Sequence, residues 1–362
     1  MSSFWELYCD QLPMVIYDGI RGEEMDRLRR IGMNCGCEYT SFPLFCSLKE
    51  RYTRFDHSIG TAIIVWKFTH SNAQTLAALF HDIATPCFAH VVDFMQGDHM
   101  TQESTEGRTR EIIEKSEYLG IILRKYGLTV DDVADYHQYP VADNDSPKLC
   151  ADRLDYTFGN LLNFGRGTRE QVKGMLDDLV VGKNEACGDE LMFRSVEQAR
   201  AFAFGALEMG KIYVSDEDRF AMQALAELLK EAVRQGIISM DDLWTDEPVV
   251  IKKLCADPAF REPWAHFRGY CEIVRGREDG IVVRAKKRFV DPMVEDRGRM
   301  TALDPEFREA VGWFLDDSQE VKLAGVSERF DLAAEEARVE MERKRLVKEY
   351  VEEFKQGNNL NR

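Results

Sequence analysis

The chain has 362 residues, of which 44% are hydrophobic and 31% charged, so it is long enough to bury a large core and has a globular composition. Its net charge of −17 argues against nucleic acid as the main partner, because a phosphate backbone would be repelled over most of the surface. No apolar run approaches the roughly 20 residues that cross a bilayer, so no membrane partner is expected. Nine scattered cysteines indicate reduced thiols in a cytoplasmic protein.

Apolar residues spaced by three and four predict that most long segments are helical. The helices expected from this pattern cover residues 58–68, 73–82, 105–127 (as one helix or two), 145–165, 168–181 and 219–236. Their starts are placed by capping residues, which are Ser71 or Asn72, Asp145 or Ser146 before Pro147, Thr168, and Asp216 or Asp218. Gly127 is expected to end the third helical segment.

Two segments break the helical pattern. Residues 180–195 are expected to form a loop and a short strand, and residues 280–292 alternate well enough for one arm of a β-hairpin. Residues 333–357 are expected to form a charged helix that faces solvent or a partner. We therefore predict an all-α fold with a minor β-hairpin and a C-terminal helical extension. Its expected parts are residues 1–235 and 236–362, packed together with a boundary near Gly236.

Histidine and aspartate residues gather at the ends of the expected helices. His57 lies at the start of the first, His81 and Asp82 lie at the end of the second, and Asp152 lies near the start of the fourth. Imidazole and carboxylate groups are typical ligands of a divalent transition metal, here Mn, Fe, Co, Ni or Zn, with Mg as a further candidate. A lone histidine in a helix is more often a core residue, so these four residues alone leave both interpretations open.

Three motifs resemble a known family. The segments "RFDHSIG" (54–60), "FHDIATPCFAH" (80–90) and "ADRLDY" (151–156) resemble the H…HD…D motif of the HD-domain metal-dependent phosphohydrolases. Their flanks are most similar to the branch of the SAM-and-HD-domain deoxynucleoside triphosphate triphosphohydrolase and the bacterial dGTP triphosphohydrolases. The resemblance covers roughly residues 15–230, and it implies the helical HD-domain fold over the first part of the chain.

The resemblance also implies roles for individual residues. It makes His57, His81, Asp82 and Asp152 the metal ligands, with Asp82 also counted among the catalytic residues. His90 corresponds to a histidine close to the scissile phosphate, and Arg54 to an arginine that contacts substrate phosphates. Arg153 and Tyr156 stand where the branch places a lysine and a tyrosine against phosphate and sugar.

The sequence departs from this branch near the expected metal. Thr85 stands where the triphosphohydrolases commonly have a histidine, and Asn160 replaces an aspartate two turns after the last ligand. If the helix of His81 continued, Thr85 would lie one turn further on the same face and would contact the substrate phosphate. The basic run 284–288 is expected to be a solvated strand edge, with a phosphate clamp or regulatory-ligand contact as the alternative.

The function expected from these patterns is hydrolysis of a nucleotide, in particular a (deoxy)nucleoside triphosphate or a related phosphate ester, by a metal-dependent enzyme. The alternative is a sensor that binds metal and nucleotide with little or no turnover, which the replacement at Thr85 and the charged C-terminal segment would suit. We also expect a homo-oligomer.

Overall fold

The computed structural model describes residues 4–49, 51–96, 108–335, 337 and 341. The helices up to the expected boundary are α1 (Met14–Gly19), α2 (Glu23–Leu28), α3 (Pro43–Cys46), α4 (Arg54–Thr69), α5 (Asn72–Phe80), α6 (Val91–Gln96), α7 (Thr109–Lys115), α8 (Glu117–Tyr126), α9 (Ala151–Asn163), α10 (Arg169–Asp177), α11 (Val196–Ile212) and α12 (Asp216–Arg234). Those that follow are α13 (Glu247–Ala256), α14 (Pro258–Arg268), α15 (Met300–Leu303) and α16 (Pro305–Asp316). Short 3-10 turns are η1 (Phe4–Leu7), η2 (Cys37–Tyr39), η3 (Tyr136–Gln138) and η4 (Asp241–Trp244). No helix of these described ranges is long and apolar enough to span a membrane.

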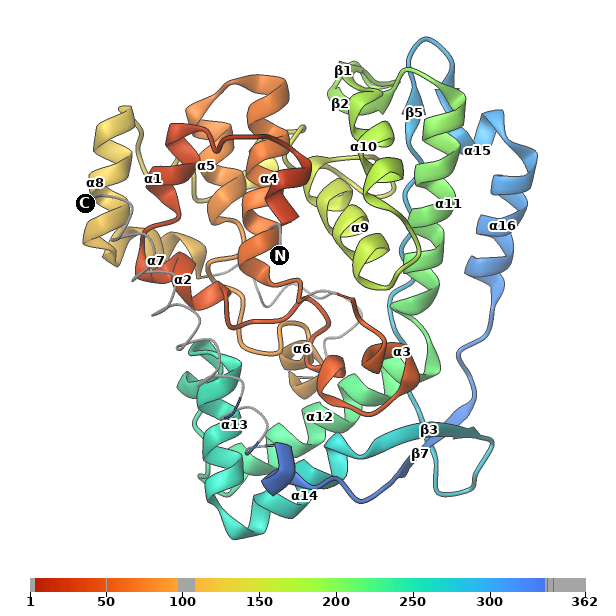
Figure 1. The fold of residues 1–362 in the computed structure, drawn as a ribbon. Helices are drawn as coiled ribbons and strands as arrows, with labels where there is room; N and C mark the ends of the chain where they lie inside the picture. Colours follow the sequence, from red (N-terminus) through yellow and green to blue (C-terminus); the bar gives the residue numbers. More distant parts are fainter. Residues whose placement is uncertain (1–3, 50, 97–107, 336, 338–340, 342–362) are drawn as a thin grey trace, which may run out of the picture.

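Helix α4 lies at the centre of the part of the fold that carries the histidines, with α5 and α1 on one side and α9 on the other (Figure 1). The run from residue 57 to residue 65 is buried on all sides, as its sequence predicts. Thr53 caps the helix and forms a reciprocal capping box with Asp56, which sets the start of α4 at Arg54. His57 is thereby placed in the first turn, pointing into the interior.

Helix α9 begins later than its sequence predicts. Residues 145–148 form a turn instead, and the helix starts at Ala151 without Asp145 or Ser146 as its cap. The backbone N–H of Ala151 donates to Val141 O at 2.8 Å, so the preceding loop folds back against the helix start. The physical reason is that this tertiary contact replaces the local cap, and it leaves Asp152 in the first turn, where a carboxylate is favoured by the helix dipole.

Other local predictions are confirmed. Thr168 caps α10 in a capping box with Gln171, and Gly127 ends α8 with a left-handed φ of 68°. Helix α12 begins at Asp216, but its cap is Ser215 rather than either aspartate. Most of the expected helix 333–357 lies outside the described residues.

The fold is mostly helical, as predicted, but it is not strictly all-α, because two small sheets are present where one minor β-hairpin was expected. The strands are β1 (Leu179–Lys183), β2 (Asp189–Phe193), β3 (Tyr270–Arg275), β4 (Ile281–Val282), β5 (Met293–Val294), β6 (Gly298–Arg299) and β7 (Lys322–Ser327). One sheet has the order β1-β2-β5-β6 and the other β3-β7-β4. Residues 180–195 supply both arms of an antiparallel hairpin, rather than the single strand that was expected.

The expected hairpin arm 280–292 is strand only at β4. Beyond Val282 the chain stays extended without a ladder partner, because side chains occupy its backbone groups: Gln319 bonds both the N–H and the carbonyl of Ala285. Strand β5, which lies after Gly236, pairs with β2, which lies before it. The division into two parts near Gly236 stays a prediction.

Candidate metal centre

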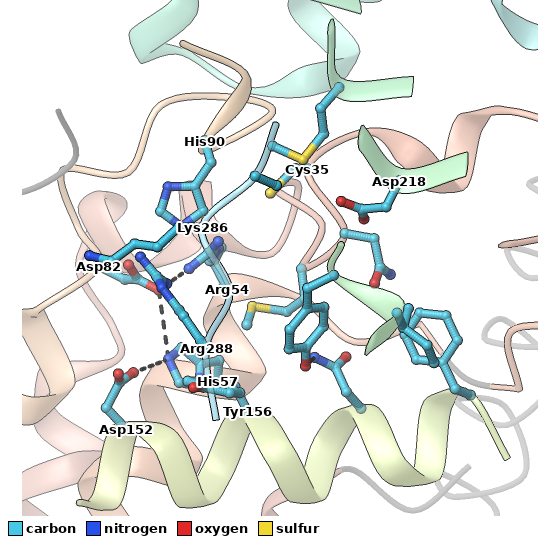
Figure 2. A pocket seen from close by; sticks show the side chains of 18 of the residues that line it. Cys35, Arg54, His57, Asp82, His90, Asp152, Tyr156, Asp218, Lys286 and Arg288 are labelled. Carbon is cyan, nitrogen blue, oxygen red and sulfur yellow. Dashed lines mark hydrogen bonds and ion pairs between the residues drawn. The ribbon is translucent and has the colours of Figure 1, made fainter. Parts of the chain in front are cut away.

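Four side chains from three segments of the chain line one cavity. Figure 2 labels three of them, His57, Asp82 and Asp152. The Nε2 atom of His57, from α4, lies 3.2 Å from His81 Nε2 and 2.9 Å from Asp152 Oδ1. His81 follows the last residue of α5, and its Nε2 lies 3.6 Å from both Asp82 Oδ2 and Asp152 Oδ1. The structure therefore brings together all four residues that the motifs single out as ligands.

The hydrogen bonds of the two imidazoles define which nitrogen is left for a cation. His57 Nδ1 lies 2.7 Å from the Asp155 carboxylate, and His81 Nδ1 lies 2.7 Å from the carbonyl of Ala78. Both partners only accept, so each Nδ1 carries a hydrogen and donates a hydrogen bond. When the rings are neutral, both Nε2 atoms carry lone pairs, and these face each other beside two carboxylates. Such an arrangement is favourable only around a positive charge.

The spacing of these atoms fits a metal ion. With ligand bonds of about 2.1 Å, neighbouring ligand atoms of a tetrahedral or octahedral ion lie roughly 3.0–3.4 Å apart and opposed ones about 4.2 Å apart. The pairs above, together with the 3.9 Å between His57 Nε2 and Asp82 Oδ2, fall within or close to that range. The donor set of two imidazoles and two carboxylates would hold Mn, Fe, Co, Ni or Zn.

The pKa values of His57 and Asp152 also indicate that a positive charge is stabilised between them. Burial by itself disfavours a charged His57 ring, but hydrogen bonds to Asp152 and Asp155 outweigh it and raise the pKa of His57 to about 10. Burial likewise opposes the Asp152 carboxylate, yet His57 and its other cationic neighbours lower the pKa of Asp152 to about 2. A proton on His57 thus takes the place that a cation would take.

Asp155 lies directly behind His57 and was missed by the sequence analysis. Its side chain is buried, with 2% exposed. Besides the hydrogen bond from His57, it accepts hydrogen bonds from the hydroxyls of Tyr8 and Tyr52, each at 2.5 Å. A carboxylate behind a ligating histidine orients the ring and increases its basicity. The available signal was its place three residues after Asp152 in "ADRLDY", on the same face of α9.

Asp82 has two partners of its own besides the histidines. Arg54 Nη1 lies 3.1 Å from Asp82 Oδ2, and the Thr85 hydroxyl donates to Asp82 Oδ1 at 2.7 Å. Burial would raise the pKa of Asp82, but Arg54 and the two imidazoles hold it well below its usual range. Arg54 keeps donors beyond this ion pair, since its Nε has no acceptor among the described residues.

The expectation that Thr85 faces the cavity is wrong. Helix α5 ends at Phe80, and residues 81–84 form a turn, so position 85 is not one helical turn beyond His81. Thr85 is fully buried and its hydroxyl is directed at Asp82 rather than at a substrate. The residue supports a ligand instead of contacting phosphate.

Arg153 is not brought into the cavity that holds the metal ligands. Its guanidinium is held by the preceding loop, where it donates to Asn144 Oδ1 at 2.9 Å and lies 3.3 Å from Asp143 Oδ1. The late start of α9 explains this, because the loop that replaces the first helical turn surrounds the side chain. Arg153 lines a second, neighbouring cavity.

His90 and Tyr156 do line the first cavity, as expected from the resemblance. His90 Nδ1 lies 3.0 Å from Asp93 Oδ2, and burial, together with the cations Arg54 and Arg288, lowers the pKa of His90. The ring of Tyr156 lies 6.4 Å from that of His57, centroid to centroid.

The first cavity has a volume of about 230 Å³ and the second about 1090 Å³. Both are lined by His81, Tyr136, Asp152, Tyr156, Lys286 and Arg288, so they share a wall at the metal centre. Away from the ligands, Asn160 lines the first cavity and donates to the Tyr213 hydroxyl at 2.7 Å. For the basic run that contains Lys286 and Arg288, the sequence analysis favoured a solvated edge and kept a phosphate clamp or regulatory-ligand contact as the alternative.

The fold defined by this structure occurs among known phosphohydrolases. The structure of a phosphohydrolase from Bacteroides thetaiotaomicron superposes with a TM-score of 0.58 at 15% identity, covering 86% of this chain and 95% of that one. A hypothetical protein from Aquifex aeolicus gives a TM-score of 0.55 at 17% identity, with 86% and 90% covered. No family model matches the chain.

One of three relatives by sequence is named a metal-dependent phosphohydrolase, and the other two are uncharacterized. The chain is 26% identical to the uncharacterized protein YdhJ of Bacillus subtilis over 78% of this chain and 80% of that protein. It is 29% identical over 48% of its length to the metal-dependent phosphohydrolase cns2 of Cordyceps militaris, of which it spans 49%. An uncharacterized protein of Methanocaldococcus jannaschii is 30% identical over 33% of this chain and 26% of that protein. The chain thus has a homologue named a metal-dependent phosphohydrolase and shares its fold with a phosphohydrolase of known structure, and the narrower triphosphohydrolase branch stays a prediction.

Proposed function

We propose that this protein is a metal-dependent phosphohydrolase that acts on a nucleotide, either a (deoxy)nucleoside triphosphate or a related phosphate ester. The observation that supports this most is the convergence of His57, His81 and Asp152, with Asp82 Oδ2 3.6 Å from His81 Nε2, in a cavity that also holds unpaired cationic donors. A homologue named metal-dependent phosphohydrolase supports the same class.

His57, His81, Asp82 and Asp152 would hold the ion. When bound, a divalent ion would polarise a phosphate oxygen and lower the pKa of a water molecule. Asp155 fixes the ring of His57 so that Nε2 faces the centre, and the main-chain carbonyl of Ala78 does the same for His81.

Arg54 and His90 have complementary tasks in this proposal. The guanidinium of Arg54 is anchored on Asp82, so its remaining donors are positioned for oxygens of the phosphate on which negative charge builds up. His90 is kept neutral by its burial and the neighbouring cations, so it is able to accept or pass on a proton. Tyr156 supplies an aromatic wall for the remainder of the substrate.

The test combines metal analysis with turnover. The wild type, a His81→Ala/Asp82→Ala variant and a His70→Asn control are purified, analysed for metals, and given a nucleotide panel with Mn²⁺, Co²⁺ or Mg²⁺. His70 lies at the exposed end of α4 with φ +48°, a conformation that asparagine tolerates, so the control should keep both metal and activity. The double variant should lose both and retain its helical content.

Two results would contradict the proposal. Full hydrolysis by the double variant would place the chemistry elsewhere. Stoichiometric binding of metal and nucleotide without turnover on any substrate would favour the alternative, a sensor that binds both without hydrolysis.

A further inference from the structure

The segment 283–290, called the strap below, runs past the metal centre as an extended chain (Figure 2). Its backbone is held by residues from elsewhere in the fold. The guanidinium of Arg219 donates to the carbonyl of Val283, and Ala285 N donates to Gln319 Oε1 at 2.7 Å. Because these anchors fix the backbone, the directions of the strap's side chains are fixed as well.

The basic residues of the strap have different surroundings, although simple alternation would place Arg284 on the side of Lys286 and Arg288. Arg284 pairs with Glu320 at 2.6 Å, and the ammonium of Lys287 donates to a main-chain carbonyl at the end of α16 at 2.9 Å. Lys286 and Arg288 line both cavities, and Lys287 lines the second. The run that was expected to be a solvated edge therefore lies partly in the site, and only Arg284 of its basic residues lines neither cavity.

Lys286 and Arg288 have no hydrogen bond or ion pair to any residue in the described part of the chain. Figure 2 shows both side chains in the cavity that Asp82 and His57 also line. Arg54 is already paired with Asp82, so Lys286 and Arg288 are the cations of the strap that are left for a ligand. Two unpaired cations in a chain with a net charge of −17 indicate a negatively charged ligand.

The position of the two residues also indicates where that charge lies. They stand in the wall that the small cavity at the metal centre shares with the larger one. The smaller cavity, of about 230 Å³, holds the ligand set, so a larger substrate has to extend past the strap into the second cavity. The part of such a substrate that follows the group bound at the metal centre would lie next to Lys286 and Arg288.

We propose that Lys286 and Arg288 bind a second phosphate group of the substrate, one that is not the phosphate at the metal centre, and so select esters with two or more phosphate groups. This inference rests on the proposed function, because the reacting phosphate is taken to lie at the metal ligands. The two residues position the substrate, and they do not take part in the bond-breaking step.

Binding of inorganic pyrophosphate tests the assignment directly. The full chain, as purified and freed of unbound metal, is titrated with pyrophosphate in a calorimeter, alongside Lys286→Gln, Arg288→Gln and the control Arg284→Gln. All three variants change the net charge equally, but only the first two remove a cation from the cavities. Loss of a charge-assisted contact should weaken pyrophosphate binding about 10-fold or more in each, while the control stays within about twofold of the wild type.

A second measurement separates positioning from folding and from chemistry. The thermal midpoint and metal content of both inward variants should match the wild type, because these side chains bond to no described residue. With a substrate that carries two phosphates, KM should rise and kcat should change little, while a phosphomonoester should be unaffected.

Three outcomes decide the proposal. Equal pyrophosphate affinity in the inward variants and the Arg284→Gln control would overturn it, and so would tighter binding of malonate than of pyrophosphate, which would indicate a carboxylate ligand. If neither the wild type nor any variant hydrolyses an ester, but Lys286→Gln and Arg288→Gln still weaken pyrophosphate binding, the proposed hydrolase activity fails and the phosphate site stands.

Discussion

Replacing Asp155 by asparagine tests whether the residues that hydrogen-bond to the metal ligand His57 affect the metal affinity of the site. Asp155 accepts three hydrogen bonds, from His57 Nδ1 at 2.7 Å and from the hydroxyls of Tyr8 and Tyr52 at 2.5 Å each. Asparagine keeps the shape but removes the charge and exchanges one acceptor for a donor. If the amide nitrogen faces His57, the imidazole has to move its proton to Nε2, which is then unable to bind a metal.

The magnitude follows from those three bonds. A hydrogen bond to a charged group contributes about 1 kcal/mol more than a neutral one, so the variant should lose roughly 3 kcal/mol of folding stability. Loss of a carboxylate behind a metal-bound histidine typically reduces metal affinity 10- to 100-fold, or about 1.4–2.8 kcal/mol. We expect Asp155→Asn to remain folded and to bind Mn²⁺ or Zn²⁺ 10- to 100-fold more weakly, as measured by competition with a chelating dye.

A substitution at Gly60, which lies next to Asp155, should displace the Asp155 carboxylate without replacing any polar group. A Cβ atom on Gly60, in α4, would lie 1.8 Å from Asp155 Oδ1, so Gly60→Ala should displace the carboxylate and weaken metal binding similarly. Gly120→Ala is the matched control, because its Cβ would meet only the end of the Arg124 side chain at 3.4 Å. Wild-type metal affinity in both Asp155→Asn and Gly60→Ala would refute the assigned role of this shell.

Two further predictions concern buried groups near the site and in the core. Thr85→Val removes the hydroxyl that donates to Asp82 at 2.7 Å and should reduce metal affinity about fivefold, whereas Thr85→Ser should retain it; equal chelator titrations of the two would count against the supporting role. Burial and a neighbouring carboxylate raise the pKa of Glu38 from 4.5 to about 8, so its proton stabilises the fold at low pH and is lost as the pH rises. Urea unfolding midpoints should therefore fall between about pH 5 and pH 8.5 in the wild type and change less in Glu38→Gln; parallel profiles would contradict this.

Much of the local structure was readable from the sequence. The apolar run after His57 predicted a buried helix, and Thr168 and Gly127 marked a helix start and a helix end at the right residues. The motif residues His81 and Asp152 were singled out although 70 positions separate them along the chain. The helix predictions succeeded because periodicity and capping depend on neighbours a few residues away. The structure brings the two motif residues to 3.6 Å from each other, and their role as metal ligands stays a prediction.

Other features depended on contacts between distant segments. Whether Thr85 faces the substrate or Asp82 was decided by the end of α5 at Phe80, which the apolar pattern running on to His81 did not reveal. The direction of Lys286 was decided by the anchors of the strap, since an extended chain without a ladder partner has no pattern of its own.

The shell around His57 shows the same limit most clearly. Tyr8 and Asp155 are 147 positions apart and meet only because α4 packs against both η1 and α9. The sequence determined which side chains were available to bind a metal, through residue type and helical spacing. Their protonation, orientation and charged surroundings were decided by the tertiary structure, because burial and long-range hydrogen bonds arise only when the helices pack.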